Sequence, residues 1–218
     1  MPLDAEKVQY TFPCLLPGAG KIQRIFEPGF MISIEGPNMN QEKIKKKKEY
    51  KTLLYFSEAY ERITGKEFVQ IYPLERPDFL CKKQNGKIVG VELTQVRRGH
   101  PETFDWDRII DNREHMKVDD ALEMIQQIVD EKENKRKEAD WKCPDSSMLI
   151  IEFNDIPLDL IQKYLNRDML PDIYQTGFCE IWIVDLTGFE AFGDVELFCF
   201  RPEHYEGYYP RPFQKPYG

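Results

Sequence analysis

Asp78 and Glu92 are the acidic side chains whose positions best suit them to act together. They lie in the segment RPDFLCKKQNGKIVGVELTQ, residues 76–95, which has Asn85-Gly86 near its middle. An Asn-Gly pair between two β-prone segments is typical of a β-hairpin with a type I′ turn, because both residues tolerate positive φ. Asp78 lies seven residues before this dipeptide and Glu92 six after it. Antiparallel pairing therefore brings the two carboxylates side by side.

The second arm of this hairpin separates polar from apolar side chains. Side chains alternate along a strand, so one face carries Gly90, Glu92 and Thr94 and the other carries Val89, Val91 and Leu93. The apolar face is expected to join the core. Two neighbouring carboxylates are costly unless a cation compensates them, and Mg²⁺ is typically held by one or two carboxylates with water and phosphate oxygens. The alternative is that Asp78 is a turn or strand-end residue and Glu92 an exposed strand residue.

Pro77-Asp78, a gap of thirteen residues and then Glu92-Leu93-Thr94 resemble the motif of the PD-(D/E)XK nuclease superfamily, the restriction-endonuclease-like fold. The resemblance covers the hairpin and, through the order of elements, residues 43–185. It implies an α/β fold with a central mixed sheet flanked by helices. It also implies Mg²⁺- or Mn²⁺-dependent hydrolysis of phosphodiester bonds in DNA, with RNA as the lesser alternative. Asp78, Glu92 and the backbone carbonyl of Leu93 would be the metal ligands.

Thr94 stands where the family pattern has a lysine that orients or deprotonates the attacking water. Thr94 could position a water by hydrogen bonding, and some family members recruit a basic residue from elsewhere. Positions from which such a residue could reach the site include Arg108, Arg113 and Lys117, and the spacing does not choose between them. The missing lysine leaves a rival hypothesis: a protein that keeps the nuclease fold without the chemistry and acts as a binding or scaffolding module.

Residues 41–64 have the periodicity of a helix, with a stripe formed by Tyr50, Leu53, Leu54, Ser57, Tyr60 and Thr64. Gly65 is a plausible C-terminal cap. The resemblance implies that the first helix supplies a further metal-binding carboxylate. Glu49, Glu58 and Glu61 are the candidates, and Glu58 is the one we favour.

Basic residues near these acids are the candidate contacts to nucleic acid. The run KIKKKK, residues 43–48, includes Lys46, and Lys82 lies in the first arm of the hairpin. Arg97 and Arg98 follow the second arm, and the planar fork of an arginine can bind two phosphate oxygens at once. The alternatives are an ordinary solvated helix face for the lysines and an exposed loop for the arginines.

The remaining elements are expected to extend the sheet. Residues 67–72, 147–154, 180–186 and 195–200 read as strands, residues 158–170 as a helix, and residues 103–139 as one long helix or two with a break near Val118. Strand, helix and strand in this order predict parallel neighbours with a right-handed connection. We divide the chain into an N-terminal arm packed on the domain (1–40), the nuclease-like domain (41–200) and a Pro- and Tyr-rich tail without regular structure (201–218).

Composition limits the class of protein. The net charge of −8 disfavours a wide DNA footprint but allows a local basic surface. Five cysteines without a CxxC or Cys/His cluster predict reduced thiols in the cytoplasm and no zinc site. No stretch has the apolar length of a membrane helix or the pattern of a signal peptide, so a cytoplasmic protein with no membrane partner is expected. Because a duplex has two strands to cut, a homodimer is one expected arrangement, although no residue marks an interface.

Overall fold

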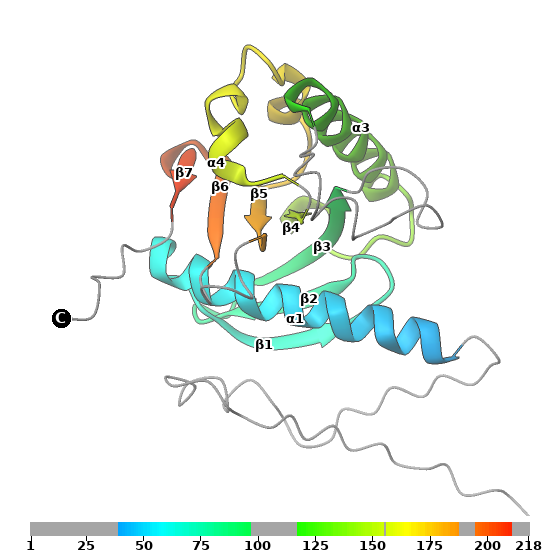
Figure 1. Cartoon of the computed structure of the whole chain (residues 1–218). Coiled ribbons are helices and arrows are strands. Elements are labelled where there is room, and N and C mark those ends of the chain that lie inside the picture. The colour runs from blue at the N-terminus through cyan, green and yellow to red at the C-terminus, as the bar shows by residue number, and fades with distance from the viewer. Residues whose placement is uncertain (1–38, 97–116, 155, 188–194, 211–218) are drawn as a thin grey trace, which may run out of the picture.

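The computed structural model describes residues 39–96, 117–154, 156–187 and 195–210. The predicted N-terminal arm lies almost entirely outside these residues, as do Arg97, Arg98, Arg108 and Arg113. The described residues form a mixed β-sheet with helices on both faces, which confirms the predicted α/β class (Figure 1).

The sheet has seven strands that lie in sequence order. The strands are β1 (Phe68–Pro73), β2 (Phe79–Lys83), β3 (Ile88–Val96), β4 (Ser147–Phe153), β5 (Glu180–Asp185), β6 (Glu196–Arg201) and β7 (Gly207–Tyr209). β1, β2 and β3 are antiparallel, β3, β4 and β5 are parallel, and β5, β6 and β7 are antiparallel. The parallel pairing of β4 with β5 confirms the prediction, whereas β7 lies in a tail that we expected to be irregular.

Helices cover the two faces of the sheet. α1 (Met39–Thr64) packs on one face, and α3 (Val118–Arg136) with the short α4 (Leu158–Ile161) packs on the other (Figure 1). Side chains alternate between the two faces of the sheet along each strand, so one strand contributes to both hydrophobic cores. In β4, Met148 and Ile150 face α1 while Leu149 and Ile151 face α3. Among the described residues, no helix is long and apolar enough to span a membrane.

The face that α1 buries differs slightly from the predicted one. The expected stripe included Leu54 and Ser57, but both are half-buried. The fully buried stripe contains Leu53, Phe56, Ala59 and Tyr60. The predicted cap is confirmed, since Gly65 has φ +67° and its N–H donates to the carbonyl of Glu61 at 2.8 Å.

The hairpin of β2 and β3 is confirmed, but the predicted turn type is wrong. The N–H of Lys83 donates to the carbonyl of Lys87 at 2.8 Å, so the loop has three residues rather than two. Gly86 has φ +82°, whereas Asn85 is not among the described residues with positive φ. This is the arrangement in which a type I turn is followed by a left-handed glycine bulge.

The helix predicted for residues 158–170 is much shorter. α4 ends at Ile161 and continues as a single 3₁₀ turn, Gln162–Tyr164. Asn166 Oδ1 then accepts hydrogen bonds from the backbone N–H groups of Asp168 and Met169, each at 3.1 Å. An asparagine side chain that bonds the backbone in this way competes with helix continuation.

A buried ion pair holds the turn end of the hairpin against the sheet. Lys83 Nζ lies 2.6 Å from Glu180 Oε1 and 3.0 Å from the hydroxyl oxygen of Tyr60. Trp182 Nε1 donates to the other carboxylate oxygen of Glu180 at 3.2 Å. These contacts connect β2 with β5 and α1, which are far apart in the sequence.

Candidate active site

Asp78 and Glu92 face each other across the hairpin. The last ladder pair of β2 and β3 is Phe79 with Val91, and one further step in the same register pairs Asp78 with Glu92. The backbone N–H of Asp78 donates to Glu92 Oε2 at 3.3 Å. Both side chains are nearly buried, with 7% of Asp78 and 6% of Glu92 exposed. The hairpin therefore places the two acids side by side, as the sequence predicted.

The next position explains why the carboxylates meet here. Continuing the register would pair Leu93 with Pro77, and a proline has no N–H to donate to the ladder. Instead, the Leu93 N–H donates to Asp78 Oδ2 at 2.9 Å. The N–H and C=O of one strand residue point to the same neighbouring strand, so the Leu93 carbonyl lies on the side of β3 that faces Pro77 and Asp78. Pro77 thus leaves this carbonyl without its ladder donor next to the acid pair.

Lys46 of α1 contacts the first acid. Its Nζ lies 2.9 Å from Asp78 Oδ1 and also 2.9 Å from Glu49 Oε2. Burial disfavours the charged ammonium, but the charges and hydrogen bonds of Asp78 and Glu49 together outweigh this effect and raise the pKa of Lys46. Lys46 is therefore a permanent cation between two carboxylates, and it brings Glu49 to the edge of the site.

Lys132 of α3 contacts the second acid. Its Nζ lies 2.7 Å from Glu92 Oε1, and 16% of the Lys132 side chain is exposed. Burial, and then the charge of Asp78, raise the pKa of Glu92, while Lys132 opposes this rise. The raised pKa means that burial disfavours the ionised carboxylate of Glu92. A cation close to it would stabilise that ionised form.

The site has the composition of a two-carboxylate cation site. Three carboxylates (Glu49, Asp78 and Glu92) and two ammonium groups (Lys46 and Lys132) give a net charge of −1. Within the described residues, no three His, Cys, Asp or Glu side chains group closely enough to hold a metal by themselves. Two carboxylates and one carbonyl fit Mg²⁺ or Mn²⁺, which keep several waters and take further oxygens from a phosphate.

Gly90 leaves room for Pro77, the residue that precedes Asp78. A Cβ atom at this position would lie 2.7 Å from Pro77 Cγ and 3.2 Å from the carbonyl oxygen of Lys142, so the proline packs directly on the glycine. The Lys142 N–H donates to the carbonyl of Arg76 at 3.2 Å, and the guanidinium of Arg76 pairs with Glu138. The residues that precede Asp78 are therefore fixed from two sides.

The other predicted site residues lie in different places. Thr94 is half-buried, two residues beyond Glu92 on the same face of β3. Glu58 is exposed and lies twelve residues beyond Lys46, which is roughly 18 Å along α1. Lys82 is exposed on β2. Lys117 is exposed at the start of α3, roughly 22 Å along the helix from Lys132. The structure therefore does not bring Glu58 or Lys117 to the acid pair.

Two other residues lie at the acid pair instead. Glu49 was a candidate that we passed over in favour of Glu58, and Lys132 was missed by sequence reasoning, although helical spacing points to both. Lys132 lies seven residues after Ile125 and three after Val129, so it continues the buried stripe of α3. Glu49 lies seven residues before Phe56 on the buried side of α1, whereas Glu58 lies two residues after it, on the other side of the helix.

Comparison of the chain with protein-family models, with curated proteins and with solved structures finds no match.

Proposed function

We propose that this chain is a metal-dependent nuclease related to the PD-(D/E)XK superfamily, which hydrolyses phosphodiester bonds in DNA, with RNA as the lesser alternative. One observation carries the proposal: Asp78 and Glu92 converge at the point where Pro77 ends the hairpin ladder, with the Leu93 N–H donating to Asp78. The order of the described elements, a helix, three antiparallel strands, a helix and a parallel strand, agrees with this proposal.

The residues of the site have separate roles in this proposal. Asp78, Glu92 and the Leu93 carbonyl would hold Mg²⁺ or Mn²⁺, which when bound activates a water and neutralises charge that develops on the phosphate. Lys132 takes the role of the lysine that Thr94 replaces, because its ammonium is held against Glu92. Thr94 is placed to hydrogen-bond a water on the same face.

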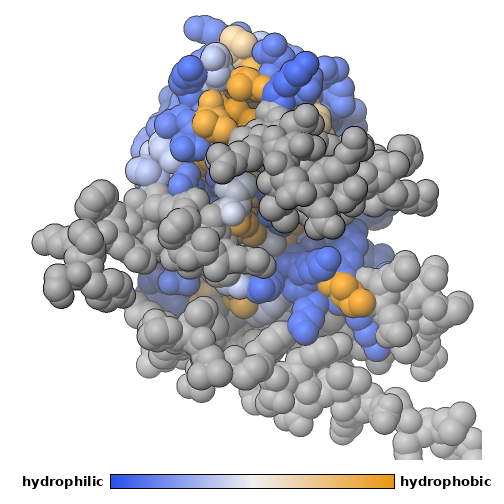
Figure 2. All heavy atoms as spheres, viewed as in Figure 1, coloured by the Kyte–Doolittle hydropathy of each residue, from blue (hydrophilic) through white to orange (hydrophobic). Residues whose placement is uncertain are grey.

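Nucleic acid would approach over the N-terminal half of α1, where Figure 2 shows hydrophilic side chains. Lys45, Lys47 and Lys48 are exposed there, within two residues of Lys46, which touches Asp78. Lysines beside the acid pair would offset its negative charge for a phosphate backbone. A homodimer would provide one such site for each strand of a duplex.

Plasmid nicking tests this proposal. With Mn²⁺, the wild type should convert supercoiled DNA to the open circle, and Asp78→Asn and Glu92→Gln should each slow this by more than about 100-fold. Asp140→Asn, at an exposed acid near the site, is the matched control and should cut normally. Wild-type rates in either site variant would refute the assignment.

The second candidate is a nuclease-fold protein that binds partners without cutting. It is favoured by the two ion pairs, because Lys46 and Lys132 already compensate the acids without a metal. Calorimetric titration with Mn²⁺ separates the two candidates. Micromolar binding that disappears in the Asp78→Asn/Glu92→Gln double variant supports the enzyme, whereas a wild type that binds no Mn²⁺ supports the binding module.

A further inference from the structure

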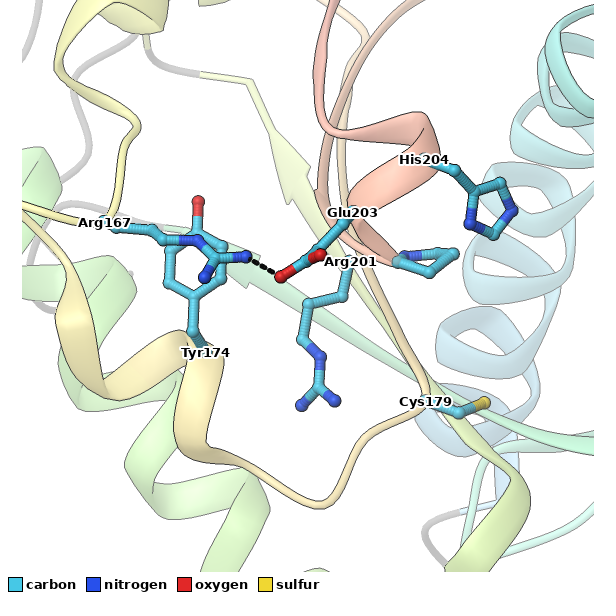
Figure 3. A pocket seen from close by; sticks show the side chains of 7 residues that line it. Arg167, Tyr174, Cys179, Arg201, Glu203 and His204 are labelled. Atoms are coloured by element: carbon cyan, nitrogen blue, oxygen red, sulfur yellow. Dashed lines mark hydrogen bonds and ion pairs between the residues drawn. The ribbon is translucent and has the colours of Figure 1, made fainter.

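A polar cavity lies near the end of β6, toward the edge of the sheet that is farther from the acid pair. It has a volume of about 390 Å³ and is lined by Arg167, Tyr174, Cys179, Arg201, Pro202, Glu203 and His204. Figure 3 shows the Arg201 side chain extending between Tyr174 and Cys179, while Arg167 and Glu203 meet at one rim. Cavities of this size accommodate small molecules rather than single ions.

Among the described residues, the Arg201 guanidinium hydrogen-bonds a single acceptor. One guanidinium nitrogen donates to the carbonyl oxygen of Thr176 at 2.6 Å, which fixes the side chain. Within the described part of the chain, Arg201 forms no ion pair with a carboxylate. A guanidinium has five N–H donors in a planar fork suited to phosphate or carboxylate oxygens.

Arg167 supplies a second guanidinium that is already oriented. It stacks on the ring of Tyr174 at 4.6 Å from the ring centroid and pairs with Glu203. The side chain of Glu203 is 77% exposed, so water competes strongly for this contact and an anionic ligand can replace it. Glu206 also pairs with Arg167, at 3.7 Å, so the two arginines and the two glutamates give this cluster no net charge.

The lining favours binding over chemistry. Burial, and then the charge of Glu180, raise the pKa of the Cys179 thiol, so the thiol stays protonated at neutral pH. The cavity therefore offers cationic donors for a ligand but no activated cysteine nucleophile.

We propose that this cavity binds the phosphate group of a phosphorylated small molecule, with Arg201 as the principal contact and Arg167 as the second. Glu203 acts as an internal competitor that occupies Arg167 until the phosphate displaces it. The proposal does not depend on the nuclease assignment, because the cavity shares no residue with the acid pair.

Titration calorimetry at constant ionic strength tests the site with three probes: inorganic phosphate, glucose 6-phosphate and AMP. We expect all three to bind, with at least one phosphomonoester several-fold tighter than inorganic phosphate. Arg201→Gln should weaken binding by about tenfold or more because charge-assisted hydrogen bonds are lost. Glu203→Gln should strengthen it a few-fold by removing the competitor, an effect that a merely structural role would not produce.

Arg76→Gln is the control, since Arg76 is also a surface arginine paired with acids; it should bind every probe normally. If Arg201→Gln fails to fold, Arg201→Lys keeps the charge and should show an intermediate loss of phosphate affinity.

NMR of arginine side-chain Nε–H signals gives a second test. Phosphate should shift two of these signals, one of which disappears in the Arg201 variant and the other in an Arg167 variant. Absence of saturable phosphate binding up to about 10 mM, near the weak limit of specific affinity, would overturn the proposal. Equal affinity for all three probes would overturn its small-molecule part.

Discussion

Lys132 reaches Glu92 from a helix that begins more than twenty residues after the strand bearing the acid. The chemistry of a motif lysine depends on where its ammonium lies, not on the strand position from which it comes. A lysine on α3 can therefore act at a site whose motif position is occupied by Thr94. The contact is partly buried, which makes the ammonium a fixed charge rather than a mobile surface group.

Replacing Lys132 by Met should lower the rate of DNA cleavage by about 100- to 10,000-fold, the usual range for losing a group that orients or deprotonates a nucleophile. Mn²⁺ binding should persist, since both carboxylates remain. Lys135→Met, one turn further along α3, removes a lysine paired with Glu131 and should leave cleavage unchanged. Normal cleavage by the Lys132 variant would assign this residue a structural role.

The raised pKa of Glu92 predicts how pH controls cation binding. The folded protein holds the Glu92 proton more tightly than the unfolded chain does, where the pKa is about 4.3. The contribution of the Glu92 carboxyl to the free energy of unfolding is therefore complete below its pKa in the unfolded chain. This contribution is lost as the pH rises through its pKa in the folded protein. A metal ion competes with that proton, so it should stabilise the fold more at higher pH.

Thermal unfolding with and without Mn²⁺ measures this effect. At a concentration of 100 times Kd, the ion should stabilise the fold by about 2.7 kcal/mol at neutral pH, and by clearly less at about pH 5. Glu92→Gln should remove most of this difference. An equal rise in Tm at both pH values would show that Glu92 does not bind the ion.

At the residue scale, sequence reasoning succeeded where two acids were tied to one local element. Asp78 and Glu92 depend on a single hairpin register, which the loop length sets. The predicted two-residue loop would pair Asp78 with Leu93, and the three-residue loop shifts the register by one residue, so that Asp78 lies opposite Glu92. Glu49 and Lys132 depend on how two helices pack on the sheet. Their helical spacing was visible, but Lys132 lies in a charged segment that resembled an ordinary solvated helix end.

At the element scale, strand alternation and turn residues predicted the hairpin, and the order strand, helix, strand predicted the parallel pairing of β4 with β5. The turn type was wrong because Asn-Gly fits both a two-residue loop and a three-residue loop with a glycine bulge. The helix at residues 158–170 was too long because apolar spacing hid the competing Asn166 side chain, which bonds the backbone N–H groups of Asp168 and Met169.

Gly90→Ala tests how the hairpin positions its acids. The new methyl group would overlap Pro77, so Pro77 and with it Asp78 must move. We expect a loss of about 1–3 kcal/mol in the free energy of unfolding, typical of overpacking, together with loss of cleavage in the protein that remains folded. Denaturant unfolding and plasmid nicking measure the two effects.

Gly86→Ala is the matched control, at a glycine with positive φ in the hairpin turn. It should cost about 1 kcal/mol through backbone strain. Because a Cβ atom there meets nothing within 4 Å, it should leave cleavage intact. Equal cleavage by both variants would mean that the contact between Pro77 and Gly90 does not position Asp78.

At the scale of the whole molecule, the charge of −8 and the lysines of α1 act in opposite directions on a nucleic acid. The overall charge repels the phosphate backbone, so binding should be confined to the lysine-rich end of α1. A small contact area of this kind gives a modest dependence of affinity on salt.

Fluorescence anisotropy with labelled duplex DNA, between about 50 mM and about 200 mM salt, measures this dependence. Lys45→Gln/Lys48→Gln should reduce the slope of log K against log salt by about 2, one for each phosphate contact. Lys87→Gln/Lys117→Gln changes two exposed lysines of the turn and of the start of α3, and should leave the slope unchanged. The same slope in both double variants would place the nucleic acid elsewhere.

The ion pair between Lys83 and Glu180 has a consequence for the proposed cation site. Together with the pairing of β3 with β4, it fixes both arms of the hairpin that carries Asp78 and Glu92 to the central strands of the sheet. If the proposed cation binds here, the spacing of the two acids is set beforehand, and its binding would cost little conformational entropy. Such a preorganised centre would bind its ion by exchange with Lys46 rather than by closure of the fold.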